Sequence, residues 1–248
     1  MKRGRIAYNG RAVWATVAGE GVILPDGSRL GHDAVQWLPP VTPGATIFAL
    51  GLNYADHSTE LGLKPPSRPL VFLKGPNTLI GHEARVPCPA DATQMHPECE
   101  LVAVIGRPAR KVRVEDALDH IGGYTVTCDY AIREYLENYY RPNLRVKNRD
   151  STTPIGPWIV DAQEIGNPQD LILATHVNGE SVQVGTTADM VFPIADLVAY
   201  LSDFMTLMPG DMIMSGTPQG VRYMKPGDRV ACTIASVGTL VSYIEPGA

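Results

Sequence analysis

The chain has few of the features that define several large protein classes. Its 248 residues include only four cysteines, and these form no CxxC pair and no zinc-ligand spacing. No apolar run approaches the roughly 18 residues that a membrane span needs. The basic N-terminus continues into Tyr8-Asn9-Gly10-Arg11, where a signal peptide would have its apolar segment. These absences argue against a disulfide scaffold and predict a cytoplasmic protein with reduced cysteines.

Nucleotide-binding and serine-hydrolase signatures are absent as well. The chain contains no Gly-x-Gly-x-x-Gly, no phosphate-binding P-loop and no Gly-x-Ser-x-Gly turn. Its net charge of −5 argues against nucleic acid or an anionic membrane as a partner. The chain is nevertheless 44% hydrophobic, which is enough for a sizeable core at this length.

What the chain does have is glycine and proline, which separate short apolar runs that are typical of strands. There are 24 glycines and 21 prolines, without a low-complexity tract. Residues 1–45 are predicted to form a small N-terminal β region, and residues 46–248 the main domain. Helical spacing is limited to three segments, at about residues 54–61, 115–122 and 193–207. The pattern predicts a mostly β (α+β) fold with a few helices and without βαβ alternation.

Two glutamates at the head of an apolar run, Glu98 and Glu100, indicate a metal site. In a strand, residues i and i+2 share a face, so both carboxylates aim at one place. Their repulsion would be relieved by a cation. Asp129, which ends the apolar run 124–128, offers a third carboxylate, and an all-oxygen set favours Mg²⁺ or Mn²⁺ over zinc. The alternative is an exposed edge strand with solvated glutamates.

His57 and Glu60 form a candidate acid–base pair. They lie three residues apart in a predicted helix, so their side chains share one face. The alternative is a surface pair without function. Thr217 lies in the turn 216–220, which offers a hydroxyl and free backbone N–H groups to a carboxylate, although it can equally be a simple turn.

Basic residues that follow Asp129 are candidates for binding an anionic substrate. Arg133 lies four residues after Asp129, and the segment 139–150 contains Arg141, Arg145 and Lys147 within an acidic protein. Arginine binds carboxylates in bidentate fashion, and a lysine beside a metal can transfer protons. The alternative for the arginines is a solvated loop.

Taken together, these segments resemble the fumarylacetoacetate hydrolase family. Six motifs stand in the family's order over about residues 46–244: Gly51-Leu52-Asn53-Tyr54-Ala55-Asp56-His57, Phe72-Leu73-Lys74, His96-Pro97-Glu98-Cys99-Glu100-Leu101, Cys128-Asp129-Tyr130, Val146-Lys147 and Gly216-Thr217-Pro218. The resemblance implies a mixed β-roll or sandwich fold, a homodimer, and Mg²⁺ or Mn²⁺ as cofactor. The residues that it implies are the metal ligands Glu98, Glu100 and Asp129, the catalytic residues His57, Glu60 and Lys147, and the substrate-binding residues Lys74, Arg133 and Thr217.

The segment from Asp129 to Lys147 resembles one branch of that family in particular. This branch decarboxylates and isomerises intermediates of homoprotocatechuate (4-hydroxyphenylacetate) catabolism. The implied substrate is a small polycarboxylate, 5-oxopent-3-ene-1,2,5-tricarboxylate. It loses CO₂ through a dienolate stabilised by the cation, and the product 2-hydroxyhepta-2,4-diene-1,7-dioate then tautomerises. Arg133, with Arg141 or Arg145, is expected to hold the distal carboxylates.

Other activities of the same family remain open from the sequence. They are an acylpyruvate (fumarylpyruvate-type) hydrolase and an oxaloacetate decarboxylase. Some members of the branch carry two family domains in one chain, whereas this chain has one, so a paralogous second subunit is a possible partner. A non-catalytic partner subunit is a further alternative, which the intact acidic and lysine residues argue against.

Overall fold

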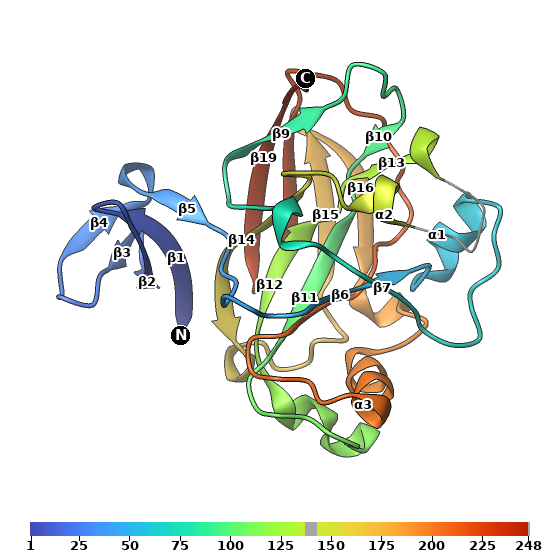
Figure 1. Ribbon diagram of the computed structural model, residues 1–248, viewed down its shortest axis with the longest axis horizontal. Helices are drawn as coiled ribbons and strands as arrows, with labels where there is room; N and C mark the ends of the chain where they lie inside the picture. The colour runs from blue at the N-terminus through green and yellow to red at the C-terminus, as the bar shows by residue number, and fades with distance from the viewer. Residues whose placement is uncertain (137–142, 248) are drawn as a thin grey trace.

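The computed structural model, which describes residues 1–136 and 143–247, has the mostly β architecture that the sequence predicts (Figure 1). One long mixed sheet runs through the molecule, and a second sheet of five strands packs against it. The few helices lie at the periphery of these sheets (Figure 1).

The N-terminal segment forms a small β unit of its own at one side of the molecule (Figure 1). Its strands are β1 (Lys2–Tyr8), β2 (Arg11–Ala18), β3 (Gly21–Ile23), β4 (Arg29–Gly31) and β5 (Gln36–Leu38). Trp37, Ile6 and Val22 are buried in a small separate core. The unit joins the long sheet where residues 2–4 pair with β14 (Thr153–Asp161). A domain boundary at residue 45 stays a prediction.

The long sheet places one strand, β11 (Cys99–Ile105), at the centre of the main body. Within the main body, the strands of the long sheet besides β11 and β14 are β6 (Ile47–Gly51), β7 (Leu70–Leu73), β8 (Leu79–Ile80), β12 (Ile121–Cys128) and β17 (Met212–Met214). β11 lies between β12 and β17, and all seven of its residues are buried. The alternative of an exposed edge strand is therefore wrong for this segment.

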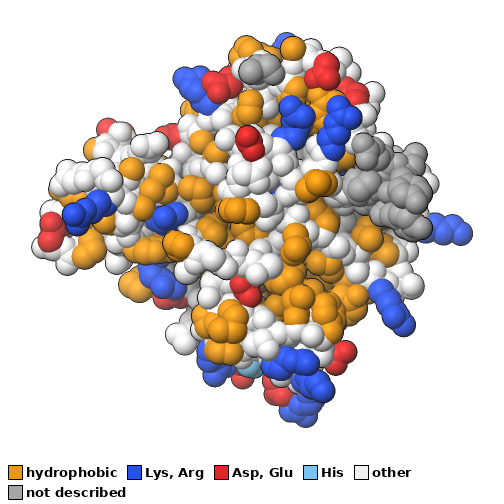
Figure 2. Space-filling view, viewed as in Figure 1, with side chains coloured by type: hydrophobic (Ala, Val, Ile, Leu, Met, Phe, Trp, Pro, Cys, Tyr) orange, Lys and Arg blue, Asp and Glu red, His pale blue; other side chains and the backbone are white. Residues whose placement is uncertain are grey.

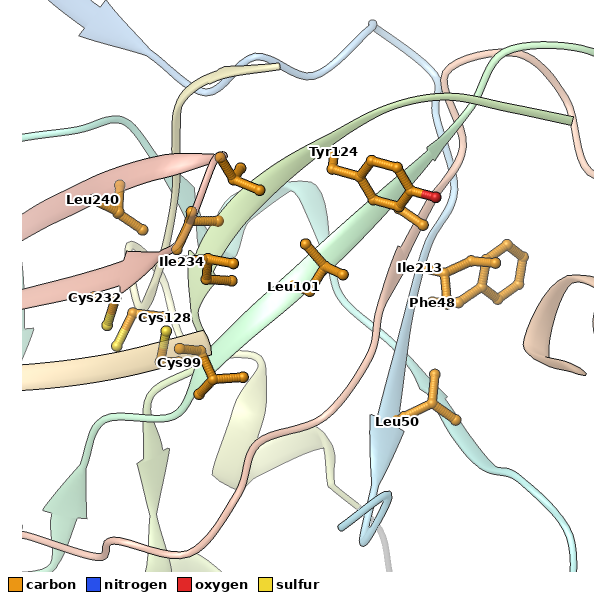
Figure 3. Packing of buried hydrophobic residues seen from close by; sticks show 14 of the residues in the cluster. Phe48, Leu50, Cys99, Leu101, Tyr124, Cys128, Ile213, Cys232, Ile234 and Leu240 are labelled. Carbon is orange, nitrogen blue, oxygen red and sulfur yellow. The ribbon is translucent and has the colours of Figure 1, made fainter. Parts of the chain in front are cut away.

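The second sheet closes the core from the other side. Its strands are β9 (Ala84–Cys88), β15 (Ile172–Val177), β16 (Glu180–Thr186), β18 (Arg229–Ile234) and β19 (Gly238–Pro246), and a short ladder joins β10 (Met95–His96) to β13 (Ala131–Ile132). Leu101 of the long sheet lies in one apolar cluster with Ile234 and Leu240 of the second (Figure 3). All four cysteines are buried and unpaired, as the sequence predicts.

In the part of the chain that the structure describes, three short α-helices complete the fold: α1 (Ala55–Glu60), α2 (Leu144–Lys147) and α3 (Ile194–Phe204). In α3, Ile194, Leu197 and Leu201 recur at helical spacing and are buried, which explains why this segment is helical. The helix expected at 115–122 is instead a 3₁₀ helix, Val114–His120, because β12 already begins at Ile121 and draws that end of the segment into the sheet.

The surface carries charges of both signs. In Figure 2, Lys and Arg side chains are interspersed with Asp and Glu between apolar areas. Among the residues that the structure describes, no helix combines the length and the apolar character that crossing a membrane would require.

Candidate active site

The pairing of β11 with β12 creates the acidic cluster. Cys99 lies opposite Cys128 in this antiparallel ladder, so Glu98, one residue before, and Asp129, one residue after, meet at the same end. The Asp129 N–H donates to the Glu98 carbonyl at 2.9 Å. Carboxylate oxygens of Glu98, Glu100 and Asp129 lie within 4.8 Å of one another, and all three residues are buried.

Two buried lysines neutralise part of this negative charge. Lys147 Nζ donates to Glu98 Oε2 at 2.6 Å and lies 2.9 Å from Asp129 Oδ2. Lys74 Nζ donates to Asp129 Oδ1 at 2.7 Å and to the backbone carbonyl of Lys147. Burial would lower the pKa of Lys147, but the carboxylates of Asp129 and Glu98 outweigh it and raise that pKa. Both ends of the Lys147–Glu98 pair are therefore charged.

Among the described residues, no lysine or arginine pairs with Glu100. Its Oε2 accepts one hydrogen bond, from the Gly216 N–H at 2.9 Å. Burial, followed by the charges of Asp129 and Glu98, raises the pKa of Glu100 well above its usual value. A buried carboxylate that two like charges destabilise is a place where bound positive charge would be stabilising.

The cluster fits a small divalent cation that prefers oxygen ligands. Magnesium holds its ligands about 2.1 Å away, so the oxygens around it lie roughly 3–4 Å apart, compatible with the spacing found here. Asp129 Oδ2 is buried and, among the described residues, accepts no hydrogen bond, because Lys147 approaches it outside hydrogen-bond geometry. Three carboxylates and one orphaned oxygen are thus available for Mg²⁺ or Mn²⁺.

Arg133 and His96 form the next layer around Glu98. Arg133 donates through Nη2 to Glu98 Oε1 at 3.1 Å and through Nε to His96 Nε2 at 2.8 Å. Burial lowers the pKa of His96 to about 4, which leaves the ring neutral and able to accept this bond. The sequence patterns did not predict a role for His96. Its position two residues before Glu98 was the one feature that could have indicated that it lies near the carboxylates.

Helix α1 presents the predicted His57–Glu60 pair. His57 Nδ1 lies 3.0 Å from Glu60 Oε2, and His57 is buried, unlike a surface pair. Glu60 also accepts backbone N–H bonds from Gly220 at 3.1 Å and Val221 at 3.0 Å. Burial raises the pKa of Glu60, but these bonds and the contact with His57 lower it below its usual value, so the carboxylate is ionised.

A cavity of about 260 Å³ brings these groups together. The residues on its polar side are His57, Glu98, Arg133, Asn143, Lys147 and Thr217. Its apolar lining consists of Phe72 and of leucines from β6, β7, the segments on either side of α1 and the position after Tyr135. The apolar wall lowers the local dielectric, so charges in the cavity interact more strongly than they would in water.

Two of the predicted substrate-binding residues lie outside the residues that line this cavity. Lys74 is enclosed behind the carboxylates, where it contacts Asp129. Arg145 is exposed and stacks on the Tyr135 ring, 4.4 Å from its centroid. Arg141 lies outside the described residues. Of the basic residues named from the sequence that the structure describes, Arg133 and Lys147 are the two that line the cavity.

The fold and the site together define a class: β-rich proteins that hold a cluster of three buried carboxylates, with a lysine beside it, next to a small cavity. Residues 46–245 match the family described as fumarylacetoacetate (FAA) hydrolase C-terminal. The chain belongs to this family, which confirms the resemblance seen in the motifs.

Individual relatives agree with this assignment. The chain is 57% identical over 205 residues to the 4-hydroxyphenylacetate degradation bifunctional isomerase/decarboxylase of Salmonella dublin, covering 83% of this chain and 48% of that protein. The chain thus spans about half the length of this relative and of two similar Escherichia coli proteins.

Solved structures show the same fold along the chain. A crystal structure of 5-carboxymethyl-2-hydroxymuconate delta-isomerase from Mycobacterium smegmatis superposes with a TM-score of 0.87 at 34% identity, covering 100% of both chains. Fumarylpyruvate hydrolase from Pseudomonas aeruginosa, solved with Mn²⁺ and pyruvate, has a TM-score of 0.77 at 30% identity and covers 87% of this chain and 94% of that one.

Proposed function

We propose that this protein is a divalent-metal-dependent decarboxylase and isomerase of 2-oxo and 2-hydroxy dienoate polycarboxylates in homoprotocatechuate catabolism. The observation that carries the proposal is the buried Glu98–Glu100–Asp129 cluster beside a cavity that is also lined by Lys147, Arg133 and His57, the partner of Glu60. The 57% identity to the Salmonella enzyme supports this substrate class. The proposal is restricted to the half of that enzyme that this chain matches.

Glu98, Glu100 and Asp129 would hold Mg²⁺ or Mn²⁺, and Lys74 would orient Asp129 through its contact with Oδ1. When bound, the cation supplies a Lewis acid that stabilises negative charge developing on the substrate. Lys74 fixes one Asp129 oxygen, which leaves Oδ2 directed toward the cluster. The carboxylates are thereby preorganised by the protein and need little rearrangement.

Arg133 and Thr217 would bind the oxygens of the substrate. Arg133 contacts Glu98 and His96 with part of its guanidinium group, and its remaining N–H groups are available to a carboxylate in the cavity. Thr217 adds a hydroxyl on the same polar side. These contacts would hold the scissile carboxylate and the conjugated chain in one orientation, which lowers the entropic cost of the reaction.

Proton transfer would be divided between Lys147 and the His57–Glu60 pair. The Lys147 ammonium group donates to Glu98 and faces the cavity, so it can deliver a proton to the carbon chain after CO₂ is lost. His57, polarised by Glu60 at 3.0 Å, can remove or return a proton during tautomerisation. A single delocalised intermediate would therefore serve both steps, with proton placement as the difference.

The decisive experiment is to incubate the protein with MgCl₂ and 5-oxopent-3-ene-1,2,5-tricarboxylate while recording CO₂ release and the ultraviolet spectrum. We expect CO₂ release followed by the spectral change of tautomerisation, both abolished in Glu98→Ala and both unchanged in Glu20→Gln, which alters an exposed glutamate of the N-terminal unit. Cleavage of an acylpyruvate without CO₂ release from the tricarboxylate would instead identify a hydrolase.

We propose a homodimer in the cytoplasm, with a paralogous second subunit as the alternative partner. Light scattering of the purified protein, alone and mixed with such a paralogue, distinguishes these assemblies.

A further inference from the structure

A buried glutamine behind the cavity has no role in the site described so far. Gln183 lies on β16, is 4% exposed, and uses both ends of its amide. Its Oε1 accepts from Thr175 Oγ1 at 2.8 Å and from the Cys99 N–H at 3.3 Å. Its Nε2 donates to Thr217 Oγ1 at 2.8 Å and to the Pro218 carbonyl at 2.8 Å.

The orientation of this amide follows from two partners whose chemistry is unambiguous. The Pro218 carbonyl can only accept, so the Gln183 atom that faces it must be the NH₂ group. The Cys99 N–H can only donate, so the atom that faces it must be the amide oxygen. A flipped amide would lose both bonds. The group beside Thr217 is therefore a donor.

This donor determines what the Thr217 hydroxyl can do. A hydroxyl has one hydrogen and two acceptor positions, and here Gln183 occupies an acceptor position. Among the described residues, no acceptor takes the hydrogen of Thr217, which lines the cavity beside Lys147 and Glu98. We propose that Gln183 is a positioning residue that holds Thr217 with its hydroxyl hydrogen available to an oxygen of a bound 2-oxo carboxylate.

Close backbone packing holds the two segments in this arrangement. Gly220 has φ +133°, and a Cβ there would lie 2.8 Å from Gln183 Cβ. A Cβ on Gly185 would lie 2.6 Å from Pro218 Cγ. The glycines thus allow β16 to approach the turn that follows β17, and this approach brings the amide within reach of Thr217. The contact joins the second sheet, through β16, to the turn 216–220 that carries Thr217.

The inference rests on the proposed function only in taking a 2-oxo carboxylate as the class of ligand. Its test measures ligand binding and requires no catalytic turnover. Oxalate, a dianion with the two adjacent oxygens of a 2-oxo acid, serves as the probe, and its dissociation constant is measured by calorimetry with saturating Mn²⁺. Thr217→Val removes the hydroxyl and should weaken oxalate binding by about tenfold to hundredfold, the range for a hydrogen bond to a charged group. Thr217→Ser keeps the hydroxyl and should bind like the wild type.

A double-mutant cycle then separates positioning from a structural role. Gln183→Met removes the donor at similar volume and should weaken oxalate binding by about threefold to tenfold, the range for one neutral hydrogen bond. In the Thr217→Val background the same change should have no effect on oxalate affinity. Thr175→Val is the matched control: it disturbs the other end of the amide, so it should lower Tm while oxalate binding stays unchanged.

The cycle has outcomes that overturn the inference. Gln183→Met with wild-type oxalate affinity, or with the same loss in the Thr217→Val background, would show that Gln183 does not act through Thr217. If Gln183→Met does not fold, Gln183→Asn replaces it, because the shorter amide stays polar but does not reach Thr217. A protein that binds oxalate as expected yet releases no CO₂ from the tricarboxylate would refute the proposed reaction and leave this inference intact.

Discussion

Replacing Lys147 with methionine should destabilise the metal-free protein and make its stability depend on Mg²⁺. Lys147 is 5% exposed and Glu98 is 6% exposed, and their charged atoms lie 2.6 Å apart. Removing one partner of a buried ion pair typically costs about 3–5 kcal/mol, because the other charge loses its compensation. Glu98 keeps Arg133 at 3.1 Å, so the cost should lie near the lower end, about 3 kcal/mol.

The assay is thermal unfolding of wild type and Lys147→Met in EDTA and in MgCl₂. For a protein of this size, about 3 kcal/mol corresponds to a Tm lower by roughly 6–12 °C in EDTA. Mg²⁺ should recover much of that loss, because the variant lacks the ammonium group that repels the ion and a ligand stabilises the state that binds it. Lys64→Met, a change at an exposed lysine, should leave Tm unaltered in both buffers.

Two results would refute this reasoning. A Tm for Lys147→Met within about 2 °C of wild type in EDTA would mean that the charge of Glu98 needs no compensation from Lys147. A Mg²⁺-induced rise in Tm no larger than that of wild type would mean that the ion does not bind beside Glu98.

Three further changes probe other parts of the molecule. Glu100→Gln removes a carboxylate that two like charges destabilise, so Tm in EDTA should not fall. Calorimetry should show Mn²⁺ affinity at least about tenfold weaker, because a ligand is lost. Unaltered affinity would exclude Glu100 as a ligand. Burial lowers the pKa of His82 to about 4. As the pH falls from about 6.5 to 4, the unfolded chain therefore gains a proton at this position that the folded chain does not. The free energy of unfolding decreases across this window. His82→Asn keeps an acceptor for the Val241 N–H and should flatten the fall in Tm between pH 7 and pH 5, whereas an equally steep fall would show that other groups cause it. Glu60→Gln should lower turnover by about a hundredfold by removing the charge beside His57, and steady-state kinetics that match wild type would exclude the pair from catalysis.

Much of the local structure could be predicted from the sequence, because it depends on neighbours along the chain. The runs 212–214 and 229–234 follow Pro-Gly-Asp turns and are strands β17 and β18 with those bounds. The helices α1 and α3 fall inside the predicted segments. Where the prediction was wrong, at residues 115–122, pairing of β12 with β11 and β14 overrode the helical spacing.

The candidate site was predictable only in part, because its contacts join residues that are far apart along the chain. The i, i+2 spacing predicted that Glu98 and Glu100 would converge, whereas their burial depends on segments distant in the chain, such as those of Lys147 and Gly216, that pack over them. The sequence gives no sign that Lys74 contacts Asp129 from behind, since 55 residues separate them. The order of motifs along the chain also cannot show that Arg133 shares its guanidinium group between Glu98 and His96.

By itself, the sequence determined the residue types and their local geometry: carboxylates on one strand, a histidine–glutamate pair on one helical turn, and a family order of motifs. The tertiary structure alone decided which groups share the cavity, because strand register and sheet packing bring together residues far apart in the chain. Gln183 shows this most clearly. It lies 34 residues from Thr217 and no motif marks it, yet the approach of β16 to the turn after β17 places its amide on that hydroxyl.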